Sequence, residues 1–93
     1  MKVRRFASVW EAIEDTGQEA ASLRARSELM IALSDLIRQS GWTQRQAAAK
    51  FSVTQPRISD LMRGRIDLFS LDTLVDMAAA GGLKPRITVK RAA

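Results

Sequence analysis

The 93-residue sequence contains no cysteine and no histidine. Disulfides, thiolate metal sites and imidazole bases are therefore excluded, and a chain without cysteine fits an intracellular protein. Clustered carboxylates and a glycine-rich phosphate loop are missing as well. Since no residues of the kind that carries catalysis come together, we expect neither an enzyme nor a metal or other cofactor.

Long apolar runs are also missing. No run is long enough to span a bilayer, and the first residues, MKVRRFASVWE, lack the apolar core of a signal peptide. We therefore expect a cytoplasmic protein without a membrane partner. Proline and glycine are scarce, at two and five residues, which favours a mostly helical chain. The apolar share of 46% suffices for one modest core.

Residues 43–64, TQRQAAAKFSVTQPRISDLMRG, form the central motif. Thr43 and Gln46 have the spacing of a capping box, which predicts the start of a short helix. Thr54, with Pro56 in the turn that follows it, predicts the start of a second helix. Because only a tripeptide separates the two, the spacing predicts a pair of short helices joined by a tight turn.

This pair resembles a helix-turn-helix of the Xre/Cro type, whose second helix enters the DNA major groove. The family usually has glycine at the turn, where the backbone has a positive φ, and this chain has Ser52. A serine there costs about 1 kcal/mol. We expect an all-α fold: a lambda-repressor-like helix-turn-helix bundle of about five helices with a short C-terminal β-strand.

The second motif helix is expected to read DNA bases from one face. With Ile58 and Leu61 directed inward, steps of about 100° per residue place the remaining side chains outward or at the flank. The expected base-reading residues are Gln55, Arg57, Ser59 and Asp60. A glutamine can pair with adenine and an arginine with guanine, each bidentate contact contributing about 1–3 kcal/mol of discrimination.

Two roles in this helix remain open. Guanine could be read by Arg57 or by Arg63. Asp60 could accept a hydrogen bond from cytosine, or it could pair with either of these arginines, which lie three residues away along the helix.

Basic residues cluster around the motif, in a chain of net charge +5. Between residues 38 and 65 the one acidic residue is Asp60, and the basic ones are Arg38, Arg45, Lys50, Arg57, Arg63 and Arg65. A single such residue is typically part of a solvated surface. A cluster on a helix-turn-helix favours DNA instead, because a duplex carries about one negative charge per 1.7 Å of its axis.

Phosphate contacts are expected at the edges of the motif. Gln44 opens the first motif helix, where free backbone amides and the helix dipole favour phosphate, and proteins of the Xre/Cro type use the matching glutamine in this way. Arg45, Arg63 and Arg65 are expected to assist. These contacts set the position of the protein on DNA and carry no sequence information.

Two further helices are expected around the motif. A long helix over about residues 18–40 follows a capping box at Thr16 and ends at Gly41. Ser70 caps the last helix, which ends at Gly81. Their expected core faces are Leu29, Met30, Leu33, Leu36 and Ile37 in the long helix, and Leu71, Leu74, Val75 and Ala78 in the last one.

The N-terminal segment, residues 1–17, contains an apolar stripe at helical spacing: Phe6, Val9, Trp10 and Ile13. So short a helix is not stable alone, and its stripe must dock on something. It can dock on its own domain, residues 18–82, or it can bind another protein. The acidic polar side of this helix, unlike the basic remainder of the chain, favours a protein partner.

The C-terminal segment, residues 83–93, alternates apolar and polar residues, which predicts a half-buried strand followed by a basic tail. A strand needs a neighbour, either Val3–Phe6 or the same strand of a second molecule. We favour a homodimer joined through Ile87 and Val89, because a palindromic operator requires two copies.

Most of the chain is similar to the antitoxins of HigA type. The segments that carry this resemblance are SVWEAIEDT, RSELMIALSDLI, TQPRISDLMRGRIDLFSLDTL and the basic tail after Gly81 and Gly82. The resemblance implies two partners: a small HigB-type mRNA interferase toxin, and the promoter of the antitoxin's own operon, which it represses. The N-terminal stripe is the candidate toxin-binding segment. The alternative is a stand-alone dimeric repressor of the Xre/Cro type.

Overall fold

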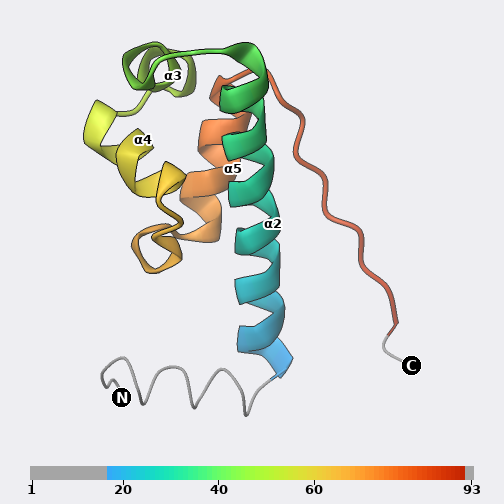
Figure 1. Cartoon of the computed structure of the whole chain (residues 1–93). Coiled ribbons are helices and arrows are strands. Elements are labelled where there is room, and N and C mark those ends of the chain that lie inside the picture. Colours follow the sequence, from blue (N-terminus) through green and yellow to red (C-terminus); the bar gives the residue numbers. More distant parts are fainter. Residues whose placement is uncertain (1–16, 92–93) are drawn as a thin grey trace.

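The computed structural model describes residues 17–91. Within this part of the chain, four α-helices and one 3-10 helix follow in order: α2 (Gly17–Ser40), α3 (Gln44–Phe51), α4 (Gln55–Met62), η1 (Ile66–Leu68) and α5 (Leu71–Ala80) (Figure 1). The expected all-α class is confirmed for these residues. None of the four helices has the length and apolar character needed to cross a bilayer.

The expected N-terminal helix falls outside the described residues. Its stripe of Phe6, Val9, Trp10 and Ile13 precedes Gly17, where the description begins. The fifth helix and the candidate toxin-binding segment therefore remain predictions.

The long helix α2 is the support for the other helices. α5 packs against α2 and α3, and α4 packs against α3 and α2 (Figure 1). The first turns of α2 extend beyond the other helices. α3 and α4 therefore lie together on one side of α2, which places the motif at the surface.

The motif begins with the expected capping box. The Thr43 hydroxyl accepts a hydrogen bond from the Gln46 amide at 3.1 Å, and the Thr43 amide donates to Gln46 Oε1 at 2.9 Å. Ser52 ends α3 with a φ of 59°, the left-handed conformation that the sequence predicts. The helix therefore stops where the turn to α4 requires it to stop.

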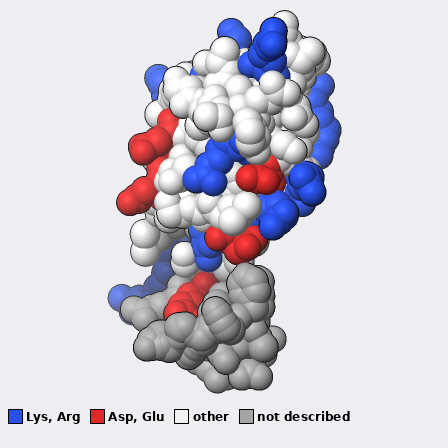
Figure 2. Space-filling model, turned by 90° about the vertical axis from the view of Figure 1, so that its left-hand side faces the viewer, with Lys and Arg blue, Asp and Glu red and all other residues white. Residues whose placement is uncertain are grey.

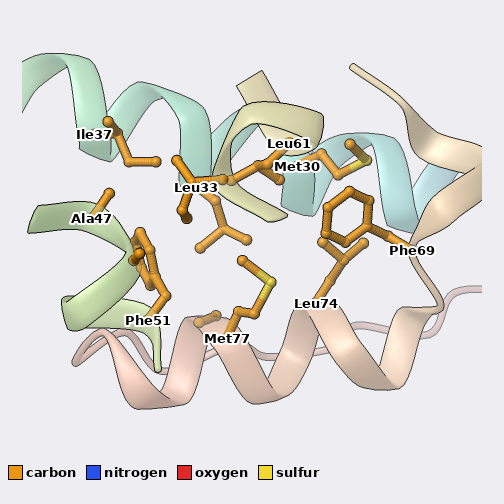
Figure 3. Close-up of a cluster of buried hydrophobic side chains, with 12 residues drawn as sticks. Met30, Leu33, Ile37, Ala47, Phe51, Leu61, Phe69, Leu74 and Met77 are labelled. Carbon is orange, nitrogen blue, oxygen red and sulfur yellow. The ribbon is translucent and has the colours of Figure 1, made fainter. Parts of the chain in front are cut away.

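The four described α-helices all contribute to one buried core (Figure 3). Phe51 from α3 and Phe69 after η1 are the largest side chains in it, and α4 adds Ile58 and Leu61. The remaining members are Met30, Leu33, Ile37, Ala47, Ala48, Leu74, Met77 and Ala78. The expected core face of α2 is confirmed at its centre, while Leu29 and Leu36 lie half-buried at its edges.

The buried face of α5 differs from the expected one. Leu74 and Ala78 are buried as expected, but Met77 is buried in place of Leu71 and Val75, which are half-buried. The helix is rotated slightly, so that Leu71 and Val75 line a groove beside the C-terminal segment. The spacing of apolar residues predicted this helix correctly, but the residues at the centre of its buried face depend on how α5 packs against α2 and α3.

The expected C-terminal strand is not confirmed, since residues 17–91 contain no strand. Strands are defined by hydrogen bonds to a neighbouring strand, and residues 83–91 run beside α2 and α5 instead (Figure 1). The segment is anchored where it starts, by a bond from the Leu83 amide to the Ala78 carbonyl at 2.9 Å. Further along, Ile87 and Val89 are 75% and 88% exposed.

Candidate nucleic-acid interface

α4 is attached to the protein by one face and leaves the other open. Ile58 and Leu61 are 0% and 1% exposed, as the sequence predicts. Gln55 and Pro56 in the first turn are exposed, while Ser59 and Asp60 are half-buried. The helix therefore presents a polar outer face that begins with the side chain of Gln55.

The N-terminus of α4 differs in one detail from the expected cap. Thr54 occupies the N-cap position with extended backbone angles, but its side chain makes no capping hydrogen bond. The Thr54 carbonyl still accepts from the amides of Arg57 and Ile58, at 3.1 and 3.3 Å. The first turn thus forms through the backbone alone, and Pro56 preorganises it without losing a required donor.

Arg57 lies at the flank of α4 and points toward the protein. Its guanidinium carbon is 4.7 Å from the centroid of the Phe69 ring, a cation–π geometry. The side chain is half-buried, unlike that of Gln55. Of the two arginines that the sequence offers for guanine, Arg57 is therefore engaged within the protein, whereas Arg63 at the end of α4 is exposed.

Asp60 forms no ion pair with Arg57 or Arg63. Within residues 17–91, the one salt bridge joins Arg38 to Asp35 at 3.4 Å. No guanidinium of the neighbouring arginines therefore holds this carboxylate.

The expected phosphate-binding residues lie at the two ends of the motif. Gln44 is the first residue of α3 and Arg45 follows it, both exposed. Arg63 and Arg65 flank Gly64, which has a φ of 73°, at the exposed end of α4.

Figure 2 shows the α3 and α4 side of the molecule, with Lys and Arg mainly at the top, along one edge and near the centre. Acidic side chains lie on the opposite edge and beside the central basic group.

The basic tail lies on the other side of α2. Residues Ala25, Leu29 and Ala32 of α2 line a groove of about 290 Å³ with α5 and residues 85–88. Met30, Ile31 and Ser34 instead face the end of α4. Steps of about 100° per residue place these two sets on opposite faces of α2. The positive charges of the tail are therefore separated from the α4 face within one molecule.

Arg26 is a residue whose role the sequence reasoning missed. Its Nη1 donates to the carbonyls of Ile66 and Phe69, each at 3.4 Å, and joins α2 to the turn after α4. Its buried Nε has no acceptor among the described residues. The signal was present, because Arg26 continues the core spacing of Met30, Leu33 and Ile37.

Comparisons with known proteins agree with this geometry. A family model described as a helix-turn-helix domain matches residues 12–90. A solved structure provisionally described as an XRE family transcriptional regulator aligns with a TM-score of 0.71 and 24% sequence identity, covering 80% of this chain and 83% of that chain. At this identity the likeness concerns the fold. A search of curated proteins found no match.

Proposed function

Since the chain belongs to the helix-turn-helix domain family, we propose that it binds double-stranded DNA as a transcription regulator of the Xre type, with α4 in the major groove. The observation that carries this proposal is the exposed first turn of α4 above a completely buried Ile58. A side chain in the first turn of such a helix reaches base edges, and Gln55 occupies that place.

Under this proposal, the two ends of the motif hold the DNA backbone while α4 reads bases. Gln55, Ser59 and Asp60 supply the base contacts. Gln44 and Arg45 contact phosphate on one side of the groove, and Arg63 and Arg65 do so on the other. In the chain, the first group lies at the start of α3 and the second follows the end of α4, so the two groups bracket the motif, which is the order that this proposal needs.

The test starts from duplexes that the wild-type protein selects out of a randomised library. Gln55→Ala should weaken binding to the selected duplex by about 1–3 kcal/mol, because a bidentate base contact is lost. Binding to an unrelated duplex should stay nearly unchanged, since it depends on phosphate contacts. Dissociation constants for both duplexes at one salt concentration measure this.

Gln39→Ala is the matched control, because Gln39 is an exposed glutamine on α2 outside the motif. It should change neither dissociation constant. If Gln55→Ala weakens both duplexes equally, Gln55 does not read bases.

We further propose that the regulator acts as a homodimer on a palindromic operator. The exposed Ile87 and Val89 support an interface at the C-terminal segment, because they leave apolar side chains uncovered on a segment without a paired neighbour. In such a dimer the two copies of α4 should lie about 34–36 Å apart, one turn of DNA.

The narrower proposal is an antitoxin that represses its own operon and neutralises a HigB-type mRNA interferase toxin. Its support is the resemblance of the sequence segments quoted above, together with the helix-turn-helix family of the chain. The proposed toxin-binding residues are Phe6, Val9, Trp10 and Ile13.

Removal of residues 1–15 separates this proposal from a stand-alone dimeric repressor. An antitoxin with this arrangement should keep DNA binding and stop co-purifying with the toxin encoded by the adjacent reading frame. A stand-alone repressor, in which the first helix completes the fold, should lose stability on thermal unfolding and have no co-purifying toxin. The full-length chain, co-expressed in the same way, is the reference for both measurements.

A further inference from the structure

The contact between Arg57 and Phe69 joins the first turn of α4 to the turn that follows η1. Arg57 is the third residue of α4, and its guanidinium carbon lies 4.7 Å from the centre of the Phe69 ring. The ring itself is 2% exposed, so the guanidinium covers it on the side of α4. A cation over a ring with little water around it is attracted more strongly than one at an open surface.

Phe69 is a fixed platform because its backbone is held from two directions. The Phe69 carbonyl and the Ile66 carbonyl both accept hydrogen bonds from Arg26 Nη1, each at 3.4 Å. The Phe69 amide also donates to the Ile66 carbonyl at 3.2 Å. Arg26 belongs to α2, so the platform is tied to the longest helix of the fold.

The first turn of α4 has few other attachments. Thr54 makes no side-chain cap, Gln55 and Pro56 are exposed, and Ile58 is the first completely buried residue of the helix. Ile58 and Leu61 hold the inner face of α4, but no side chain of the first turn is completely buried. The contact of Arg57 with the held ring adds a restraint in this first turn.

We propose that Arg57 is a positioning residue for DNA reading, with Phe69 as its platform and Arg26 as the anchor of that platform. The contact sets the orientation of the first turn of α4 and therefore the direction in which Gln55 enters the groove. Arg57 acts through its contact with the Phe69 ring and does not itself contact a base edge. This inference rests on the proposed function, because it concerns how the same helix discriminates between DNA sequences.

The test compares Arg57→Gln, Phe69→Leu and the double variant with the wild type. Duplexes are first selected with the wild-type protein from a randomised library, and dissociation constants are then measured for a selected and an unrelated duplex. Each single variant should lower the ratio of specific to non-specific affinity several-fold and by at most about tenfold, because the first turn must then be ordered on the DNA at a cost no greater than the cation–π contact that orders it in the wild type. The double variant should lose no more than either single variant, because both remove the same contact.

The pattern of base preference gives a second measurement. When the selected duplex is changed one base pair at a time, Arg57→Gln should weaken discrimination at every base pair that α4 reads. Loss of a direct base contact would weaken it at one base pair only.

Arg24→Gln is the matched control. It makes the same substitution at an exposed position of α2, outside the motif and its basic cluster. The specificity ratio of this variant should equal that of the wild type. Because Phe69 is in the core, thermal unfolding of each variant is measured too, and Arg57→Gln decides the question if Phe69→Leu does not fold.

Three results would overturn the inference while leaving the proposed function intact. The first is a loss of discrimination confined to one base pair, and the second is a double variant whose fold-loss in specificity equals the product of the two single losses. The third is an unchanged specificity ratio together with a dependence of log K on log salt that is lowered by about one, which marks a phosphate contact. A wild-type protein that selects no sequence from the library would instead overturn the proposed function, and this positioning role with it.

Discussion

Ser52 has a backbone conformation that side chains other than glycine adopt at a cost. Its φ of 59° and ψ of 43° are left-handed, and it is the one described non-glycine residue with a positive φ. The conformation persists because the turn is fixed from both sides. The Ser52 amide donates to the Ala49 carbonyl at 3.4 Å, and the Val53 amide donates to the Ala48 carbonyl at 3.0 Å.

Ser52→Gly should therefore stabilise the protein. The expected gain is a few tenths of a kcal/mol in the free energy of unfolding, because the cost of about 1 kcal/mol for serine here is partly offset by the larger conformational entropy of glycine in the unfolded chain, about 0.4–1 kcal/mol. Chemical denaturation measures it. Ser22→Gly, the same change at an exposed helical position, should lower the free energy of unfolding. A destabilised Ser52→Gly protein would show that the serine side chain contributes to the turn.

Local residue roles were predictable where the physical cause is local. The capping box of Thr43 and Gln46 and the inward Ile58 and Leu61 follow from neighbours within one or two turns, while the left-handed Ser52 was implied by the resemblance to the Xre/Cro type. The roles of Arg26 and Arg57 were not predictable in this way, since their partners lie far along the chain. Arg26 is 40 residues from Ile66 and 43 from Phe69.

A glycine at the end of α5 lies directly against an aromatic ring of α3. A Cβ atom added at Gly81, the C-cap of α5, would overlap the ring of Phe51 in α3. Gly81 has a φ of −84°, so the need for glycine arises from this close approach and not from the backbone conformation. The contact sets the distance between α5 and the first helix of the motif.

Gly81→Ala should consequently destabilise the protein by about 1–3 kcal/mol, the usual cost of overpacking a core. The midpoint of chemical denaturation measures the loss. Combining it with Phe51→Leu should give less than the sum of the two single effects, because the smaller side chain leaves room for the added methyl group. Additive effects would mean that the Phe51 ring is not what a methyl group meets.

The faces of the helices were predictable to within a small rotation. For α2 the pattern identified Met30, Leu33 and Ile37 correctly. For α5 it gave Leu74 and Ala78 correctly but missed Met77, because methionine and valine both fit an apolar stripe and the final choice depends on how α5 packs against its neighbours.

At the scale of the whole molecule, the main open feature is the C-terminal segment with its exposed Ile87 and Val89. Ile87→Pro should weaken the proposed dimer about tenfold or more, because proline cannot donate a backbone hydrogen bond to a paired strand. Sedimentation equilibrium measures this. Thr88→Ala keeps every backbone donor and should leave the dimer intact. A dimer that persists in Ile87→Pro would place the interface elsewhere.

The C-terminal segment also shows what the sequence of one chain does not predict. Alternation of apolar and polar residues indicates that a segment is suited to a sheet, but a strand forms only with a partner. Within residues 17–91 no second extended segment is paired with it. The same limit applies to the operator, because base contacts depend on a molecule that the sequence does not contain.

The position of α2 between α4 and the C-terminal segment has a consequence for assembly. A second copy that packed squarely against the groove beside Leu29 and Ile87 would turn its own α4 in the opposite direction, and one duplex would not reach both copies of α4. A dimer that binds one palindrome therefore has to join edge to edge through its C-terminal segments, so that both copies of α4 face the same side.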